Sequence, residues 1–187
     1  MTPLVVLDRD GVINEDSDQY IRSVEDWHPS PGSIEAIARL SQAGIQVAVA
    51  TNQSGLSRGY FGLDELEAIH TELRARVAAA GGEIAAIAYC PHLPAEGCDC
   101  RKPRTGLLDA IHRELQLPLK GVPFIGDSLK DLQAAEKAGC RPVLVTTGKG
   151  ADTRAALEAP GVQLENPEAV TVFPDLAAAT AAILDQH

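Results

Sequence analysis

The chain has 187 residues, of which 45% are hydrophobic and only 4% aromatic, and its formal net charge is −10 at pH 7. This length suffices for a sizeable core, and we expect residues 1–187 to form a single domain. Because phosphate backbones and anionic membrane surfaces bind basic proteins, the acidic charge argues against nucleic acid or a membrane as a partner.

Short apolar runs alternate with segments of helical spacing along the chain. The runs predict strands at residues 4–7, 45–50, 84–89, 122–125 and 143–145, with a weaker sixth near 170–173. Helical spacing predicts helices at residues 33–43, 63–80, 106–117, 129–138 and 152–159, with a closing helix near 176–183. This alternation predicts a doubly wound, Rossmann-like α/β fold, with a parallel sheet and helices on both faces.

Polar sequences follow four successive strands of this pattern. Residues 8–11 (DRDG) come after the first strand, 51–55 after the second, 90–102 after the third and 126–128 after the fourth. In open parallel sheets, ligands bind beyond the carboxyl ends of the strands. The sequence therefore predicts one cleft at that edge of the sheet, built by all four segments.

The first of these segments places two acids two residues apart. Along a strand such residues point to the same side, so Asp8 and Asp10 would crowd and repel each other. An aspartate in an ordinary Asp-Gly turn is the alternative interpretation. Because Asp127 also directly follows a strand, we favour three carboxylates around Mg²⁺, a hard cation that prefers oxygen ligands. One carboxylate could then attack phosphorus while its neighbour acts as acid and base.

Two further residues fit a phosphoryl-transfer site at the same edge. The reaction needs positive charge around the phosphoryl oxygens, and Lys102 offers a cation while Thr51 offers a hydroxyl. Taken singly, Thr51 is more readily explained as a helix N-cap, and Lys102 as a solvated surface lysine. Their shared position at one sheet edge favours the functional interpretation of both.

These segments resemble the four ordered motifs of the haloacid dehalogenase superfamily of phosphatases. The resemblance spans residues 4–148 and lies in residues 8–12 (DRDGV), Thr51, Lys102 and residues 126–131 (GDSLKD). It implies that Asp8 is the nucleophile and Asp10 the general acid and base, with Thr51 and Lys102 stabilising the phosphoryl group. It also implies Mg²⁺ held by Asp8, the backbone carbonyl of Asp10 and Asp127, with Asp131 orienting this network from behind.

The segment CPHLPAEGCDC carries three thiols and an imidazole, at Cys90, His92, Cys98 and Cys100. Such a set predicts tetrahedral, structural Zn²⁺ in a loop after the third strand, where the ion would fix the approach of Arg101 and Lys102. A Cys90–Cys98 disulfide is the alternative, which a reducing cytoplasm disfavours. Cys140 lies apart and is expected to be a buried small residue.

The zinc loop resembles that of two subgroups of the superfamily, the D-glycero-D-manno-heptose 1,7-bisphosphate phosphatases and the histidinol-phosphate phosphatases. The segments TNQSGLSRGYF and GDSLKDLQAA resemble the first subgroup, which we therefore favour. That resemblance implies hydrolysis of heptose bisphosphate, expected at the C7 phosphate, in the synthesis of lipopolysaccharide core precursors. Histidinol phosphate, an intermediate of histidine biosynthesis, is the alternative substrate.

No insertion large enough for a separate cap domain follows either of the first two motifs, so loops must shape the substrate pocket. By the heptose resemblance, the residues that bind substrate are Asp16, Ser17, Asp18, Gln19, Thr51, Asn52, Gln53, Ser54, Arg101, Lys102 and Ser128. Arg58 is our addition, because a cation in the loop after the second strand could meet the remaining phosphate; a solvated arginine is an equal alternative. His70 shows no partner pattern and is expected to be an ordinary surface or packing residue.

A phosphoacceptor receiver domain is the rival from another class, because it also uses Asp, Mg²⁺, Thr and Lys on a parallel sheet. The position of the acid after the first strand and the zinc loop argue against it, and the acidic charge argues against a zinc-bearing nucleic-acid module. No apolar run has the length of a membrane span and no signal segment is visible. We therefore expect a cytoplasmic monomer that acts on a small phosphorylated sugar.

Overall fold

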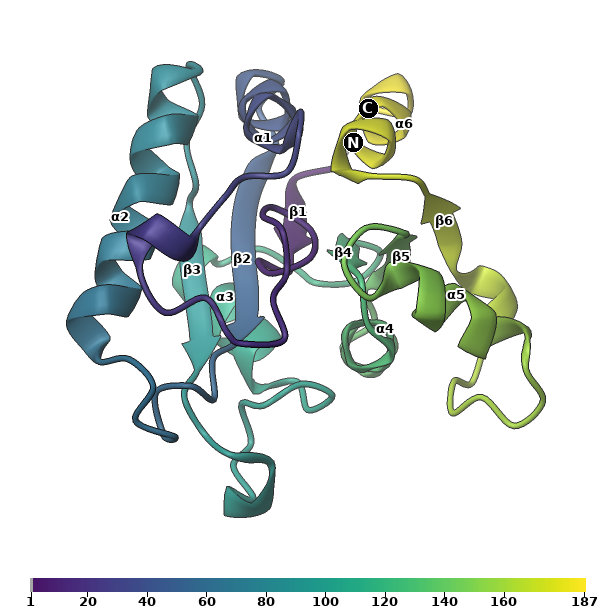
Figure 1. Cartoon of the computed structure of the whole chain (residues 1–187). Helices are drawn as coiled ribbons and strands as arrows, with labels where there is room; N and C mark the ends of the chain where they lie inside the picture. Colours follow the sequence, from purple (N-terminus) through teal and green to yellow (C-terminus); the bar gives the residue numbers. More distant parts are fainter. Residues whose placement is uncertain (1) are drawn as a thin grey trace.

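Strands from along the whole chain build one parallel sheet. In the computed structural model, which describes residues 2–187, six strands pair in the order β3-β2-β1-β4-β5-β6 and every neighbouring pair is parallel (Figure 1). Their bounds are β1 Leu4–Leu7, β2 Gln46–Asn52, β3 Ala86–Cys90, β4 Pro123–Gly126, β5 Arg141–Val145 and β6 Thr171–Phe173. This is the Rossmann-like strand order. Receiver domains have the order 2-1-3-4-5, so the topology removes that alternative.

Helices cover both faces of the sheet, as expected for a doubly wound fold. They are α1 Ser33–Gln42, α2 Leu63–Ala79, α3 Gly106–Leu115, α4 Leu129–Lys137, α5 Gly150–Glu158 and α6 Leu176–Asp185. Val5 and Leu7 of β1 pack with α1, α2 and α6, whereas Leu4 and Val6 pack with α3 and α4 on the opposite face. No helix within residues 2–187 has both the length and the apolar character needed to cross a membrane.

The predicted bounds of strands and helices agree closely with the observed ones. Helix α3 ends at Leu115 instead of residue 117, because Gln116 adopts a left-handed conformation with φ of 55°. Helix α5 begins at Gly150, two residues earlier than the sequence pattern indicates. These small differences lie at helix ends, where tertiary contacts and not side-chain periodicity decide the last turn.

The segment between β1 and α1 is folded against the protein and carries the short 3₁₀ helix η1 Val24–Asp26. Ile13, Ile21 and Trp27 within it are buried in the same core as α1 and α2. Arg76 of α2 also stacks over the Trp27 ring, 5.6 Å from its centroid. These contacts hold the segment as a fixed wall over the carboxyl edge of the sheet.

Candidate active site

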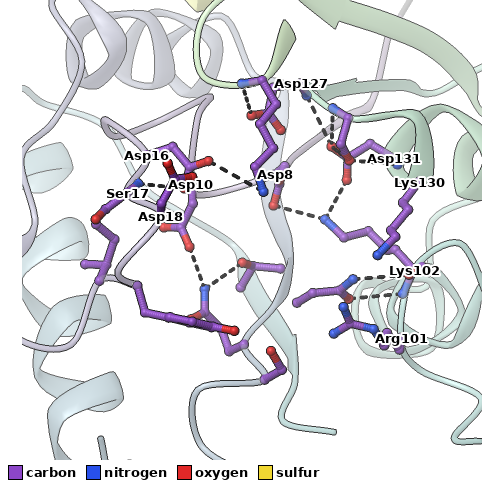
Figure 2. A pocket seen from close by; sticks show the side chains of 18 of the residues that line it. Asp8, Asp10, Asp16, Ser17, Asp18, Arg101, Lys102, Asp127, Lys130 and Asp131 are labelled. Atoms are coloured by element: carbon purple, nitrogen blue, oxygen red, sulfur yellow. Dashed lines mark hydrogen bonds and ion pairs between the residues drawn. The ribbon is translucent and has the colours of Figure 1, made fainter. Parts of the chain in front are cut away.

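A cleft of about 470 Å³ opens at the carboxyl edge of the sheet, where the four polar segments meet (Figure 2). The predicted residues that line it are Asp8, Asp10, Asp16, Ser17, Asp18, Thr51, Asn52, Gln53, Ser54, Arg101, Lys102, Asp127, Ser128 and Asp131. Two predicted residues do not reach it. Gln19 lines a neighbouring hollow, and Arg58 is exposed outside the cleft. The contact that we expected between Arg58 and a second phosphate therefore has no support in this geometry.

Asp8 lies directly beyond the end of β1 and is only 9% exposed. Its Oδ1 accepts hydrogen bonds from the backbone N–H of Arg9 at 2.8 Å and from Lys102 Nζ at 3.0 Å. Burial and the nearby charge of Asp131 raise the pKa of Asp8 well above its usual value, although Lys102 counteracts them. One oxygen of the carboxylate is thus oriented, and the group as a whole requires further positive charge to stay ionised.

Lys102 is buried, with 2% of its surface exposed, and connects two of the acids. Its Nζ lies 3.0 Å from Asp8 Oδ1 and 2.7 Å from Asp131 Oδ1, and donates to the carbonyl of Ala50 at 2.8 Å. Burial would lower the pKa of Lys102, but the two carboxylates outweigh it and raise the pKa above its usual value. Asn52 holds the backbone of Lys102 through two hydrogen bonds, of 3.0 and 3.2 Å. The surface-lysine alternative is therefore wrong.

Asp127 and Asp131 lie at the start of α4 and play different parts. Asp131 Oδ2 accepts from the backbone N–H groups of Asp127 and Ser128 at 3.1 Å each and from Ser128 Oγ at 3.0 Å. Among residues 2–187, Asp127 Oδ2 accepts a single hydrogen bond, from the backbone N–H of Lys149 at 2.9 Å. Burial, followed by the charge of Asp131, raises the pKa of Asp127 to about 7. A side chain on Gly11, which has a φ of 84°, would collide with the Asp127 carboxylate, so glycine is required there.

These acids form a group that could hold a metal ion. Oxygen atoms of Asp8, Asp127 and Asp131 lie within 4.8 Å of one another. A hard divalent cation prefers oxygen ligands, and its charge would offset the repulsion between the buried carboxylates. Because both oxygens of Asp131 are already engaged, Asp8 and Asp127 are the side chains with an oxygen to spare.

Asp10 is saturated with hydrogen-bond donors. Arg9 donates to Oδ1 through Nε at 2.8 Å and to Oδ2 through Nη2 at 3.2 Å. Asn14 adds a bond of 3.0 Å to Oδ1 and Gln53 one of 3.1 Å to Oδ2. Burial alone would raise the pKa of Asp10, but the charge of Arg9 and these hydrogen bonds lower it below the usual value. β1 ends at Leu7, so both acids lie beyond the strand and the strand geometry predicted for them was wrong. The predicted repulsion is present, because the charge of Asp10 is one of the causes that raise the pKa of Asp8.

Thr51 lies within β2, in register with Tyr89 of β3, and is 1% exposed. The helix N-cap alternative for this residue is therefore wrong. Its Oγ1 accepts a hydrogen bond of 2.9 Å from Gln53 Nε2, the same amide nitrogen that donates to Asp10. Gln53 thus links the hydroxyl predicted to stabilise the phosphoryl group to the predicted acid and base.

The cysteine-histidine loop gathers its four side chains into one cluster. The ligand atoms of Cys90, His92, Cys98 and Cys100 lie within 4.8 Å of one another. Cys90 Sγ is 3.0 Å from Cys100 Sγ and 3.6 Å from Cys98 Sγ, and His92 Nδ1 is 3.1 Å from Cys100 Sγ. All four cysteines are free thiols, so the structure contains no Cys90–Cys98 disulfide. Cys140 is buried and is not part of this group of four, as predicted.

Comparison with known proteins agrees with this geometry. The HAD-hydrolase-like family model matches residues 99–179. A D-glycero-β-D-manno-heptose-1,7-bisphosphate 7-phosphatase of Pseudomonas putida is 57% identical over 175 residues, which cover 94% of this chain and 95% of that protein. The chain belongs to the haloacid dehalogenase family of phosphatases. A protein of the same name from Pseudomonas aeruginosa is 55% identical over 181 residues and 97% of both chains.

Two solved structures of heptose bisphosphate phosphatases are also similar to this haloacid dehalogenase phosphatase. The D,D-heptose 1,7-bisphosphate phosphatase of B. bronchiseptica, complexed with magnesium and phosphate, is 48% identical, with a TM-score of 0.92 and full coverage of both chains. The enzyme of Burkholderia thailandensis is 39% identical, with a TM-score of 0.73 over 98% of this chain and 99% of that one. The fold predicted from the alternation of strands and helices is thus confirmed, and so is the family predicted from the motifs.

Several residues of this haloacid dehalogenase phosphatase escaped the sequence analysis. Tyr20, Lys130 and Lys149 line the cleft, and Arg9 and His70 are buried beside it. Lys130 lies within the motif at residues 126–131 but was given no role, and Lys149 in the loop after β5 lies in no motif, so nothing separated either from a surface lysine. A signal for His70 did exist, because it shares the apolar face of α2 with Leu66, Leu73 and Val77.

Proposed function

We propose that this chain hydrolyses D-glycero-β-D-manno-heptose 1,7-bisphosphate at the C7 phosphate, on the route to lipopolysaccharide core precursors. The observation that carries the reaction class is the Asp8 carboxylate, which lines the cleft with Oδ1 held by Lys102 at 3.0 Å and Oδ2 without a hydrogen bond among the described residues. The choice of substrate is supported by 57% identity to the P. putida enzyme over 94% of the chain.

The nucleophile and the acid divide the work in two steps. Asp8 Oδ2 attacks phosphorus, the bond from phosphorus to the sugar oxygen breaks, and Asp10 gives its proton to that oxygen. Asp10 then takes a proton from water, which attacks the aspartyl-phosphate, releases phosphate and restores Asp8. The donors around Asp10 lower its pKa, so the free carboxyl is ionised. The negative charge of a phosphate dianion beside it would raise that pKa, so Asp10 would take up its proton from solvent as the substrate binds.

Lys102 and Thr51 supply charge and a hydroxyl where the transferred phosphoryl group would lie. Lys102 already bonds the nucleophile, so its ammonium stands next to the developing charge without rearrangement. Asp131 Oδ1 lies 2.7 Å from Lys102 Nζ, and this ion pair fixes the position of the ammonium group. These contacts support a role in stabilising the transition state.

We propose that Mg²⁺ is held by Asp8, Asp127 and the backbone carbonyl of Asp10. The raised pKa values of Asp8 and Asp127, both due first to burial, indicate acids whose negative charge Lys102 only partly compensates. Bound there, the ion would supply positive charge to the substrate phosphate and to the nucleophile. The magnesium and phosphate in the B. bronchiseptica structure support this assignment.

We propose Zn²⁺ as a structural ion in the loop after β3. Three sulfur atoms and one imidazole nitrogen within 4.8 Å fit a tetrahedral site that leaves no position vacant. The backbone N–H of Arg101 lies 3.4 Å from Cys98 Sγ, so the site is directly joined to the residues that reach the cleft. The ion would then anchor Arg101, which we propose recognises substrate, and Lys102.

A direct comparison of substrates tests the proposal. With Mg²⁺ present, kcat/KM should be higher for heptose bisphosphate than for histidinol phosphate, and phosphorus NMR should show heptose 1-phosphate as product. Asp8→Asn serves as the inactive control from the same preparation. A preference for histidinol phosphate would overturn the proposed substrate and leave the phosphatase assignment intact.

We further propose that residues 1–187 form one domain that works as a cytoplasmic monomer. Sedimentation of the purified protein tests whether it is a monomer.

A further inference from the structure

A buried chain of contacts runs from α2 to the general acid. Arg9 is completely buried, and its side chain holds both oxygens of Asp10, with Nε 2.8 Å from Oδ1 and Nη2 3.2 Å from Oδ2. The remaining terminal nitrogen of Arg9, Nη1, lies 3.2 Å from Nε2 of His70. His70 is 8% exposed and lies 61 residues further along the chain, on α2.

The chemistry of the two side chains fixes the direction of the last contact. A guanidinium group only donates, so His70 Nε2 must accept and the ring proton must be on Nδ1. Burial, followed by the charge of Arg9, lowers the pKa of His70 to about 3, which keeps the ring neutral and able to accept. Tyr89 of β3 packs beside the ring, with the centroids 6.2 Å apart. His70 is thus a buried acceptor directed at Arg9.

We propose that His70 is a positioning residue for the general acid, because its hydrogen bond fixes the Arg9 guanidinium and thereby the orientation of the Asp10 carboxylate. This inference rests on the proposed phosphatase reaction. The two bonds from Arg9 to Asp10 orient the guanidinium only relative to that carboxylate, and the other donors to Asp10, Asn14 and Gln53, do not touch the guanidinium nitrogen that faces α2. The bond to His70 gives the guanidinium a third fixed point on a different element, so the plane of the Arg9–Asp10 pair is set. Helix α2 therefore contributes to catalysis without lining the cleft.

The leaving group offers a way to see this role separately from stability. A sugar alkoxide needs a proton from Asp10 as it departs, whereas p-nitrophenolate is a stable anion and departs without one. The quantity kcat/KM covers only the steps up to the first irreversible one, which is formation of the aspartyl-phosphate. A misplaced Asp10 should therefore lower kcat/KM for the alkyl phosphate and hardly change it for p-nitrophenyl phosphate.

The test compares His70→Leu, which removes the acceptor, with His70→Gln, whose side-chain oxygen can replace Nε2. For His70→Leu we expect kcat/KM to fall about 10–100-fold with heptose bisphosphate, part of the full general-acid contribution, and less than about threefold with p-nitrophenyl phosphate. His70→Gln should restore most of the loss. The ratio of the two kcat/KM values is independent of the folded fraction, so partial unfolding does not disturb it.

Leu73→Ala is the matched control, since Leu73 is also buried on α2, about one turn beyond His70, and its aliphatic side chain can accept no hydrogen bond from Arg9. It should change both substrates equally. If His70→Leu does not fold, His70→Asn replaces it, because its shorter amide cannot reach Arg9 and should give the same selective loss. An equal loss on both substrates, or no rescue by glutamine, would overturn the positioning role. If the wild-type enzyme fails on heptose bisphosphate, the substrate proposal fails instead, and the comparison is made with an alkyl phosphate that it does hydrolyse.

Discussion

Replacing Lys102 by methionine should weaken both the fold and the reaction. Methionine has nearly the same length but no charge, so the cavity stays filled while the acids lose their partner. Lys102 is 2% exposed and its Nζ lies 3.0 Å from Asp8 and 2.7 Å from Asp131. Removing one partner of a buried ion pair costs about 3–5 kcal/mol, because the remaining charge is left unpaired. We expect a loss of that size in the free energy of unfolding of the metal-free protein.

The loss in rate has a separate magnitude. Removing one preorganised donor from a transition-state site typically lowers kcat about 10²–10³-fold. Lys102→Met should therefore lower kcat by at least this factor with both p-nitrophenyl phosphate and heptose bisphosphate, since it acts on the phosphoryl group that the two substrates share. Urea unfolding measures the first effect and steady-state kinetics with Mg²⁺ the second.

A second substitution separates these two effects. In Lys102→Met/Asp131→Asn the acid behind the lysine is neutral as well, so about 2 kcal/mol of the lost stability should return. The activity should not return, because the phosphoryl group still lacks its cation. If Lys102→Met lost less than about 1 kcal/mol, or if the double variant regained activity, the buried triad would not work as described.

Three further outcomes are expected. Asp8→Asn should abolish turnover of p-nitrophenyl phosphate, because an amide is a poor nucleophile; near-normal rates would contradict the mechanism. The pKa of Asp127 is raised to about 7, so below pH 7 protons compete with Mg²⁺ for this carboxylate. The apparent affinity of the protein for Mg²⁺ should therefore fall about tenfold per pH unit below pH 7, which calorimetry can measure. Between the ordinary value of 3.8 and about 7, Asp127 of the metal-free folded state holds a proton that the unfolded state has released, so the contribution of Asp127 to the free energy of unfolding should decrease as the pH rises; an increase in that contribution, measured as the difference between wild type and Asp127→Asn, would contradict the raised pKa. Cys98→Ser should lower the zinc content from about one ion per chain and reduce kcat/KM, with elemental analysis as the measurement; a zinc-free wild type would exclude the structural ion.

The sequence alone was enough to predict those strands and site residues that are determined by short, contiguous stretches of the chain. Buried strands such as Leu4–Leu7 are continuous apolar runs, and the acids that follow them mark the carboxyl edge directly. The layout of Asp8, Asp127 and Lys102 could be predicted because each follows its own strand in a parallel sheet.

The parts that the sequence could not supply depend on contacts between distant segments. Nothing local relates Arg9 to His70, since a pairing over 61 residues depends on how α2 packs. Arg58 illustrates the opposite case: its loop follows a strand, yet the residue is exposed and does not line the cleft, so its contact with a phosphate stays a prediction. The strand geometry predicted for Asp8 and Asp10 also failed, because it needed a strand that reaches Asp10, whereas β1 ends at Leu7.

The loop between β3 and α3 is divided into an outer tip and an inner arm. Residues 94–97 are exposed, whereas Lys102 is tied to Asn52 through two hydrogen bonds and Arg101 to Cys98. Chain length at such a tip costs little, since loop-closure entropy grows slowly with added residues. Ala95 is thus a suitable attachment point for a fluorescent label or an immobilisation tag. A probe placed there would lie outside the group of Cys90, His92, Cys98 and Cys100, and the two hydrogen bonds to Asn52 would still hold the backbone of Lys102.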